Sequence, residues 1–305
     1  MKSKKNTISK NINSICILLT DDQSINQIII LKTFNNLKKM KFIKIYFIGD
    51  KNLFRKIFKF CKTQNDKFIF VDIRNKNNFK YLNDITLKGI SLFEEKKIKF
   101  IINMPLCKKK FLKNRHSGFT EFFSEKLDNK NNENMILFNK NFSVCPITTH
   151  IKISEVENKI NKKKLMKSID NIIQFISLIK NKKINIILLG LNPHASKDME
   201  VNNKDYSIIS PIVKKYKKIG VKIKGPVSAD TAFIDCKNKI FIGMYHDQVL
   251  IPFKTLNKFD GINITIGKKI IRLSPDHGVA TELISKPKQV NNLSFLRCLQ
   301  FCEKY

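Results

Sequence analysis

The first part of the chain alternates short apolar runs with amphipathic segments. The apolar runs have the length of buried strands, and the segments between them repeat their hydrophobic residues at helical spacing. Strands that alternate with helices in this way form βαβ units, which build a largely parallel sheet. An α/β fold is therefore predicted. The expected strands are residues 13–20, 44–49, 67–73 and 100–103, and the expected helices are residues 25–40, 53–62 and 82–97.

The second part of the chain continues the alternation. A hydrophobic stripe from Leu165 to Ile179 predicts one long helix, and Ser154 with Glu157 forms a capping box at its start. The lysines at 162–164 are expected on the solvated face of this helix. The other elements expected here are strands at 135–138, 142–147, 183–190 and 240–244, and helices at 205–219 and 291–305.

The composition is that of an ordinary globular protein with an unusual charge. Hydrophobic residues make up 42%, whereas 58 Lys and Arg against 25 Asp and Glu give a formal net charge of +33. The lysines are spread along the whole chain with Asn and Ile, as A/T-rich codons would produce, and no zinc-finger spacing, RNA-binding aromatic motif or continuous basic helix accompanies them. We therefore expect nonspecific attraction of polyanions but no specific nucleic-acid partner.

The cysteines and the N-terminus indicate a cytoplasmic protein. The seven cysteines are scattered and form no C-x-x-C pair, as is typical of thiols that stay reduced. The first apolar run is cut off by Asp21 and Asp22, which makes it too short for a signal peptide. No run approaches the roughly 18 apolar residues of a membrane span, so no membrane partner is expected.

Three of the five histidines follow apolar, β-like runs. These are His150, His194 and His246. If the three runs are neighbouring parallel strands, the imidazoles meet at one edge of the sheet, where three histidines can hold a divalent cation and leave positions open for substrate. The alternative for each of them is a hydrogen-bonded structural histidine.

The densest group of polar candidates follows the strand at 240–244. Residues 245–248, Y-H-D-Q, stand at the end of that strand, where ligands bind in open α/β sheets. Lys254 and Arg272 follow, each beside an apolar segment that could hold its side chain in place. No G-x-G-x-x-G motif follows a predicted strand, so a Rossmann dinucleotide site is not expected.

Five sequence blocks identify a family resemblance. They are G-F-T-E-F-F at 118–123, T-T-H at 148–150, G-L-N-P-H-A at 190–195, G-P-V-S-A-D-T at 225–231 and residues 245–278. In order and spacing they resemble the 4-hydroxythreonine-4-phosphate dehydrogenase family of vitamin B6 biosynthesis, over nearly the whole chain. The resemblance implies a fold like that of the isocitrate and isopropylmalate dehydrogenases, with two α/β domains facing an active-site cleft and a homodimer that completes each site.

The resemblance also implies domains, an activity and cofactors. Residues 1–115 with 262–305 would contribute cofactor contacts, and residues 116–261 the metal site and the dimer interface. Members of the family oxidise the 3-hydroxyl of 4-phosphooxy-L-threonine with NAD or NADP, and the β-keto acid loses carbon dioxide to leave 3-amino-2-oxopropyl phosphate. One divalent cation per subunit, Zn, Mg or Co, is implied as well.

Individual roles are implied by motif. The metal ligands would be His150, His194 and His246. The catalytic residues would be Asp230, Asp247 and Lys108, with the two aspartates moving protons or orienting a histidine. The substrate contacts would be Thr120, Lys254, Asn263 and Arg272. The cofactor contacts would be Asp276, His277 and Gly278.

Departures from the family pattern leave rival functions open. Phe119 stands where the family has a substrate-contacting histidine, with His116 as the nearest substitute, and the family's glycines are lost at 196–200. Because glycine lets backbone approach a ligand closely, weaker ligand affinity is expected. One rival is a dehydrogenase of threonate or erythronate 4-phosphate. The other is a catalytically lapsed protein that binds polyanions.

Overall fold

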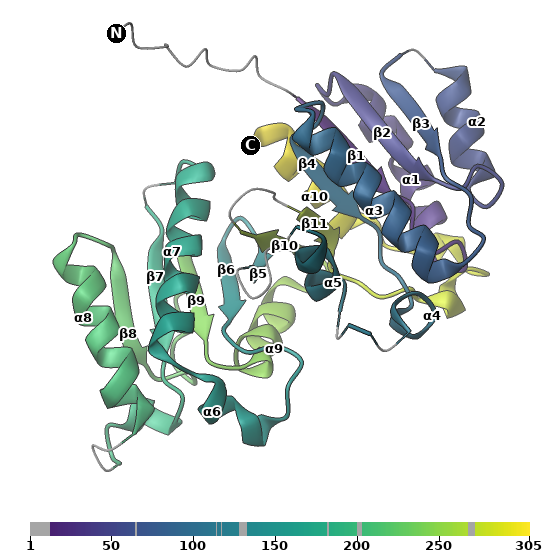
Figure 1. Cartoon of the computed structure of the whole chain (residues 1–305). Coiled ribbons are helices and arrows are strands. Elements are labelled where there is room, and N and C mark those ends of the chain that lie inside the picture. Colours follow the sequence, from purple (N-terminus) through teal and green to yellow (C-terminus); the bar gives the residue numbers. More distant parts are fainter. Residues whose placement is uncertain are drawn as a thin grey trace, which may run out of the picture. The chain divides into compact units, whose positions relative to one another are not determined.

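The chain folds into two compact units (Figure 1). The computed structural model describes residues 13–305 except 65, 114, 117, 128–132, 182, 200–202 and 268–271. Unit 1 contains the described residues of Met1–Phe111, Gly278–Asn292 and Leu299–Lys304, and unit 2 contains those of Leu112–His277, Leu293–Cys298 and Tyr305. Residues 262–277, which the sequence groups with the N-terminal domain, therefore cluster with unit 2 here.

Unit 1 is built on parallel strands in the order β3-β2-β1-β4. The central strand β1 is buried along its whole length, as a parallel strand covered on both faces should be. Gly89 of α3 lies against Cys16 and Leu18 of β1, where the absence of a side chain lets the helix approach closely. The elements of unit 1 are β1 Ser14–Leu18, α1 Asn26–Lys39, β2 Lys44–Gly49, α2 Arg55–Thr63, β3 Phe68–Asp72, α3 Asn78–Glu94 and β4 Phe100–Asn103.

One short-range feature corrects the predicted start of a helix. Helix α3 begins at Asn78, earlier than expected, because the Asn77 side chain accepts from the backbone N–H groups of Phe79 and Lys80 and caps it. Two helices cross the division between the units along the chain: α4 (Lys108–Leu112) and the closing helix α10 (Leu293–Lys304), which agrees with the amphipathic helix expected at 291–305.

Unit 2 is built on strands in the order β11-β10-β5-β6-β9-β7-β8. Strands β6, β9, β7 and β8 run parallel to one another, whereas β5 pairs antiparallel with β6 and with β10, and β10 pairs antiparallel with β11. The elements of unit 2 are α5 Phe119–Lys126, β5 Asn134–Phe138, β6 Phe142–Pro146, α6 Val156–Lys159, α7 Lys162–Leu178, β7 Asn185–Leu189, α8 Ser210–Lys218, β8 Ile223–Val227, β9 Lys239–Gly243, α9 His246–Asn257, β10 Ile262–Ile266 and β11 Arg272–Pro275.

Helices cover both faces of the unit 2 sheet. Phe253 of α9 packs edge-on against Phe142 at 5.4 Å between ring centroids, within a buried cluster that also holds Phe241. On the opposite face Phe175 of α7 meets Phe138 of β5 at 5.9 Å. Each fully buried aromatic side chain of this kind stabilises the fold by about 1.5–3 kcal/mol through burial. The packed sheet therefore gives the loops at its strand ends a rigid base.

The predicted long helix of residues 154–179 is in fact two helices. Helix α6 ends at Lys159, and α7 starts at Lys162 with Asn161 as its cap, whose side chain accepts from Lys164 N at 2.9 Å. The capping box of Ser154 and Glu157 was therefore a wrong prediction. Ile160, which follows α6, has extended backbone (φ −83°, ψ 116°), so the helix is interrupted there.

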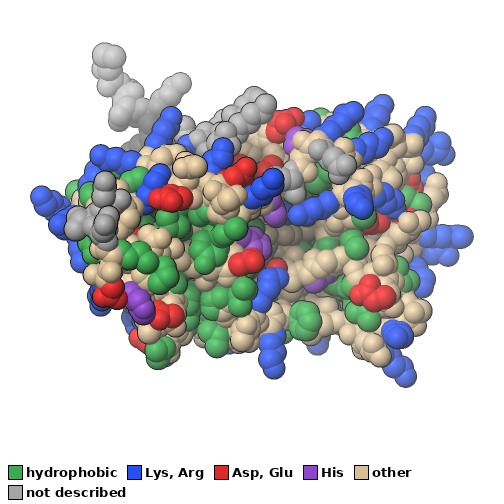
Figure 2. Space-filling model, turned by 90° about the horizontal axis from the view of Figure 1, so that it is seen from below, with side chains coloured by type: hydrophobic (Ala, Val, Ile, Leu, Met, Phe, Trp, Pro, Cys, Tyr) green, Lys and Arg blue, Asp and Glu red, His purple; other side chains and the backbone are tan. Residues whose placement is uncertain are grey.

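Charge is distributed over the surface. Figure 2 shows Lys and Arg side chains dispersed over the visible face, interspersed with acidic and apolar ones. Within the part of the chain that the structure describes, no helix combines the length and the apolar character that a membrane crossing requires.

Candidate functional site

The three candidate histidines follow the carboxyl ends of neighbouring strands. Strand β9 pairs in parallel with β6 on one side and with β7 on the other, so the three strands end at the same edge of the sheet (Figure 1). His150 comes after β6, His194 after β7, and His246 is the first residue of α9 directly after β9. The strand order thus brings three histidine-bearing segments to one edge, as the hydrophobic pattern predicts.

Hydrogen bonds tie these segments to one another. Thr148 donates from its hydroxyl to the Met244 carbonyl at 2.7 Å, which joins the segment of His150 to the end of β9. Gln248 accepts from Met244 N at 2.7 Å and donates to the Gly190 carbonyl at 2.7 Å. One amide side chain therefore joins the ends of β9 and β7.

Two of the imidazoles lie close together. The ring centroids of His150 and His246 are 6.0 Å apart. His246 Nδ1 is hydrogen-bonded to Asp247 Oδ1 at 2.6 Å, which leaves Nε2 as the other ring nitrogen. His150 Nδ1 lies 3.5 Å from Glu121 Oε1. Each ring is thus oriented by a carboxylate, the arrangement that commonly surrounds a metal-ligating histidine.

His194 is held in a strained turn by a buried carboxylate. His194 and Ala195 have φ of 52° and 53°, in the left-handed region. Asp205 is fully buried and accepts from Leu191 N at 2.7 Å and from the Ser196 hydroxyl at 2.5 Å. Asp205 therefore accepts hydrogen bonds from the donors that point into this turn, and these bonds fix the shape of the turn. His194 is exposed on the turn.

The distance between the two rings is longer than one tetrahedral cation would give. With a metal–nitrogen distance of about 2.1 Å, two imidazoles on such a cation have ring centroids roughly 5.2 Å apart. The ring centroids of His150 and His246 are 6.0 Å apart. Among the described residues, no three His, Cys, Asp or Glu side chains gather closely enough to hold a metal, so His194 does not complete the set within one chain.

Arg272 lies at the centre of a buried polar cluster. Its Nη1 donates to the hydroxyls of Thr120 at 3.1 Å and Thr265 at 2.8 Å, and its Nη2 donates to Ser274 at 3.2 Å. Burial lowers the pKa of Arg272 to about 9, although the negative charge of Glu121 acts to raise it. The guanidinium is therefore still cationic at neutral pH. The structure thus brings together two of the predicted substrate contacts, Thr120 and Arg272.

Phe119 has a defined place beside this cluster. The Arg272 guanidinium lies over the Phe119 ring at 4.8 Å from its centroid, a cation–π contact. His116, in contrast, packs edge-on against Phe122 at 5.3 Å, and its Nδ1 lies 3.8 Å from Glu125. The aromatic ring at position 119 therefore supports the arginine in place of the family's histidine.

The other two predicted substrate contacts are Asn263, on the hairpin of β10 and β11, and Lys254 of α9. Asn263 of β10 pairs with Ser274 of β11, and Thr265 pairs with Arg272. The two pairs are two residues apart along each strand, so all four side chains share one face. The Oδ1 atom of Asn263 is buried and has no hydrogen-bond partner among the described residues. Lys254 of α9 donates to Asp276 Oδ1 at 2.9 Å, just beyond this face. The hairpin face therefore carries one cation and an amide, and α9 contributes a second cation.

The remaining predicted residues are distributed over both units. Asp230 is exposed, and the Ser228 hydroxyl together with the charge of His194 lowers its pKa. His277 belongs to unit 2, whereas Gly278 and Lys108 belong to unit 1. Lys108 is exposed and is the first residue of α4. In the same helix, Lys110 lies 3.3 Å from the buried carboxylate of Asp21.

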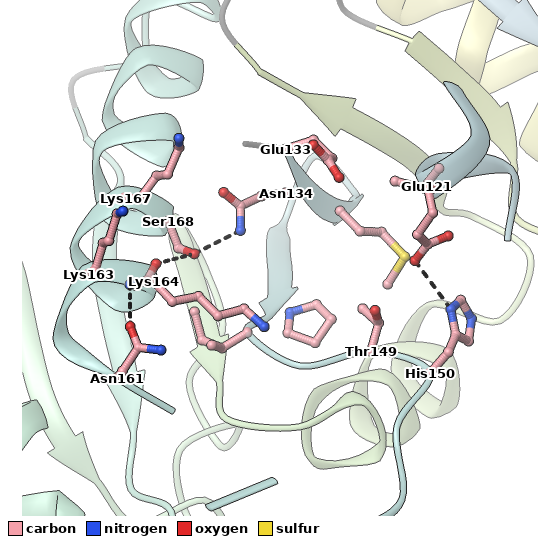
Figure 3. A pocket seen from close by; sticks show the side chains of 14 residues that line it. Glu121, Glu133, Asn134, Thr149, His150, Asn161, Lys163, Lys164, Lys167 and Ser168 are labelled. Carbon is pink, nitrogen blue, oxygen red and sulfur yellow. Dashed lines mark hydrogen bonds and ion pairs between the residues drawn. The ribbon is translucent and has the colours of Figure 1, made fainter. Parts of the chain in front are cut away.

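A cavity of about 560 Å³ opens in unit 2 beside two of these residues (Figure 3). Thr120 and His150 belong to its wall, and Figure 3 shows Glu121 next to His150. The remaining lining residues come from α7, β5 and the ends of β6: Glu133, Asn134, Met135, Pro146, Ile147, Thr149, Asn161, Lys163, Lys164, Lys167 and Ser168. The cavity is of a size that holds a small metabolite.

Sequence reasoning overlooked three kinds of residue here. Gln248 belongs to the Y-H-D-Q block, but its two hydrogen bonds join strand ends that are distant in sequence. Asp205 follows a polar stretch that carries no motif. Lys163 and Lys164 are exposed, as expected for a solvated face, but they also line the cavity, which the sequence did not indicate.

Comparison with known sequences gives a single family. The model of the family described as pyridoxal phosphate biosynthetic protein PdxA matches residues 15–302. A 4-hydroxythreonine-4-phosphate dehydrogenase from Sulfurihydrogenibium sp. (strain YO3AOP1) is 32% identical over an alignment of 307 residues, which covers 89% of this chain and 92% of the relative. A putative D-threonate 4-phosphate dehydrogenase from Oceanobacillus iheyensis is 34% identical over 216 residues, 68% of this chain and 63% of the relative.

Comparison with solved structures gives the same fold. A putative 4-hydroxythreonine-4-phosphate dehydrogenase from Salmonella typhimurium superposes with a TM-score of 0.79 at 20% identity, covering 95% of this chain and 98% of the other. An isocitrate dehydrogenase from Methylococcus capsulatus superposes with a TM-score of 0.50 at 9% identity, covering 95% and 84%. The α/β fold of the isocitrate dehydrogenase type, which the sequence predicts, is confirmed.

Proposed function

Because the chain belongs to the family of pyridoxal phosphate biosynthetic protein PdxA, we propose that this oxidoreductase acts on 4-phosphooxy-L-threonine in pyridoxal phosphate biosynthesis. It oxidises the 3-hydroxyl and releases carbon dioxide, leaving 3-amino-2-oxopropyl phosphate. The family match over residues 15–302 carries the proposal, and a cytoplasmic location accords with it. The polar cluster around Arg272 supports it, because a buried guanidinium with its hydroxyl partners is suited to an anionic substrate.

Substrate binding is assigned to Thr120, Lys254, Asn263 and Arg272. Arg272 holds the Thr120 hydroxyl by donating to it, so the hydroxyl hydrogen of Thr120 is directed away from the guanidinium and toward a ligand anion. The buried Asn263 Oδ1 gains a hydrogen bond when a substrate hydroxyl or ammonium group donates to it. Lys254 supplies a second positive charge, which Asp276 keeps in place.

Proton transfer and metal binding are assigned to the strand-end segments. Asp230, Asp247 and Lys108 are the candidates for moving protons, and Asp247 also orients His246. A divalent cation, Zn, Mg or Co, on His150, His194 and His246 would polarise the substrate hydroxyl and the later ketone, and bound NAD or NADP would accept the hydride. Asp276, His277 and Gly278 are assigned to cofactor contacts.

A homodimer is part of the proposal. Unit 2 exposes large apolar side chains on and just after α9, among them Ile251, Leu256 and Phe259 at 61%, 56% and 56%. A second copy that covers them would remove apolar surface from water. Because His194 does not join His150 and His246 within one chain, a site completed across subunits accounts for the full ligand set. We retain residues 116–261 as the part that carries the metal ligands and the interface.

A turnover assay tests the function. Purified protein with added Zn²⁺, Mg²⁺ or Co²⁺ is given 4-phosphooxy-L-threonine and either NAD or NADP, and cofactor reduction and carbon dioxide release are followed together. Both should appear, and both should disappear after chelation of the metal. Cofactor reduction without carbon dioxide would contradict the decarboxylating reaction.

A second candidate substrate is an amine-free one, threonate or erythronate 4-phosphate. The match to the putative D-threonate 4-phosphate dehydrogenase favours it. The buried acceptors Asn263 Oδ1 and Asp276 Oδ2, neither with a hydrogen-bond partner among the described residues, instead favour a substrate with an ammonium group. Relative kcat/KM for the two substrate types decides between them, and turnover of the amine-free compounds alone would exclude our choice.

The candidate from another class is a lapsed enzyme that binds polyanions, which the net charge of +33 would favour. Metal content after gentle purification separates the two. The enzyme should carry a stoichiometric cation that is lost in His194→Ala, whereas the lapsed protein should carry none in either form.

A further inference from the structure

Helix α7 contributes a wall of positive charge to the unit 2 cavity. Lys163, Lys164 and Lys167 all line this cavity of about 560 Å³. Their spacing of one and four residues places them on one side of the helix. Figure 3 shows Lys164 extending from α7 toward the middle of the cavity, whereas Lys163 and Lys167 extend upward along α7.

These three ammonium groups form no ion pair with a carboxylate of the described residues. None of the ion pairs or side-chain hydrogen bonds found among the described residues involves the Nζ atom of Lys163, Lys164 or Lys167. Burial and the nearby charge of Lys159 lower the pKa of Lys164. Three like charges on one side of a helix repel one another, so an anion bound beside them would be stabilised.

The polar groups around the lysines suit an oxyanion. Thr149 and Ser168 line the same cavity and carry hydroxyls, and Asn161 lies at the start of α7. Asn161 already accepts from the Lys164 backbone N–H, so the lysine side chains and not the helix end supply the attraction. The carboxylates of the cavity, Glu121 and Glu133, come from other elements, and Glu121 is next to His150 (Figure 3).

We propose that Lys163, Lys164 and Lys167 form an anion subsite that takes a phosphate group, either as inorganic phosphate or as the phosphate of a monoester. Lysine binds phosphate as a point charge on a flexible side chain. Three lysines carry more positive charge than is needed to neutralise a phosphate dianion. The cavity is larger than a phosphate ion, so the rest of a small ester can extend toward Thr120 and His150. This subsite is separate from the Arg272 cluster, and it rests on the proposed function only where the ester is the substrate.

Binding of inorganic phosphate tests the subsite without turnover. The chain offers a matched control, because Lys214, Lys215 and Lys218 of α8 have the same spacing and are exposed. The test compares wild type with the triple variants K163Q/K164Q/K167Q and K214Q/K215Q/K218Q at constant ionic strength. Phosphate affinity is measured by equilibrium dialysis, and the midpoint of thermal unfolding is measured in phosphate and in chloride.

We expect phosphate to bind wild type and the α8 variant alike and to raise the unfolding midpoint of both. Loss of the three α7 charges should weaken phosphate binding by about tenfold or more and abolish the rise. Equal phosphate affinity in all three proteins would overturn the subsite. Equally weakened phosphate binding in the two variants would overturn it as well, because the effect would then come from net charge. Both Lys→Gln variants should keep the far-UV circular dichroism of wild type; if the α7 triple does not fold, the single variant Lys164→Gln replaces it under the same criteria.

Kinetics identify the source of the phosphate. If the subsite holds the phosphate of 4-phosphooxy-L-threonine, inorganic phosphate competes with the substrate, and the α7 variant has a raised KM with a nearly unchanged kcat. If it holds a separate phosphate, KM is unchanged in the α7 variant while phosphate binding is still lost. Absence of turnover would refute the proposed function and leave the dialysis result as the measure of the subsite.

Discussion

Gln248 donates from Nε2 to the carbonyl oxygen of Gly190 at 2.7 Å and so connects the start of α9 to the end of β7. The same amide accepts from Met244 N at 2.7 Å. His246 lies two residues before Gln248, and His194 lies four residues after Gly190. The distance between two candidate metal ligands therefore depends on one side chain that touches neither of them.

Replacing Gln248 by Met should separate these segments. The change removes both hydrogen bonds and leaves a backbone N–H and a carbonyl without partners, which costs about 1–3 kcal/mol of stability. Because the bonds orient the histidine segments, zinc affinity should also fall by about tenfold to a hundredfold. Denaturant unfolding and zinc titration measure the two effects.

Gln248→Glu is the matched control for that change. It keeps an acceptor for Met244 N but cannot donate to Gly190, so it isolates the connection between the two strands. If zinc affinity in Gln248→Glu equals that of wild type, Gln248 does not position His194.

Asp205→Asn should loosen the turn that carries His194. The charged acceptor is fully buried and accepts from the Ser196 hydroxyl and from the backbone N–H of Leu191. The amide replaces one of these two acceptor oxygens by an NH2 group, which donates and cannot accept. Removing the charge should cost about 1–3 kcal/mol of stability. Limited proteolysis should then cleave within residues 190–199 sooner than in wild type, whereas cleavage elsewhere should be unchanged.

Arg272→Lys should lower kcat/KM without disrupting the fold. One ammonium group cannot reproduce the planar donor arrangement that reaches Thr120, Thr265 and Ser274, and it loses part of the contact with the ring of Phe119. We expect kcat/KM to fall about tenfold or more. Arg297→Lys, at a partly exposed arginine that pairs with Asp260, is the control, and an equal loss there would count against a specific role of Arg272.

Asp72 should make unit 1 sensitive to acid. Burial raises the pKa of its carboxyl, but the backbone N–H and ammonium group of Lys51 outweigh this and hold the pKa below its usual range. A depressed pKa in the folded state stabilises the fold above the unfolded pKa of about 4, and that contribution is lost as the pH falls through the folded value.

Asp72→Asn removes this contribution. The side chain is partly exposed, so solvent screening limits the effect to about 0.5 kcal/mol. The difference in stability between wild type and variant should therefore be present at pH 6 and shrink toward pH 3. Denaturant midpoints across this range measure it, and a difference that does not change with pH would contradict an ionic origin.

Local patterns predicted much of the fold and the approximate position of the site. Runs such as residues 44–49 were predicted to be buried strands because burial removes their apolar side chains from water, and strand β2 occupies those residues. His150, His194 and His246 could be placed after strands for the same reason. The start of α7 was not predicted, because Ser154 and Asn161 are both residue types that cap helices and no local pattern marks the extended backbone of Ile160 between them.

The amino-acid sequence by itself determined the α/β architecture and the family, because both depend on short-range hydrophobic periodicity and on motifs that can be read residue by residue. The tertiary structure alone decided which partners meet: Gln248 with Gly190, Arg272 with Thr120, and the α7 lysines with a cavity. These contacts join positions far apart in the chain, and their geometry follows from the order in which strands pair and helices pack. No local pattern encodes that order, since the same periodicity is compatible with many arrangements of the same strands and helices.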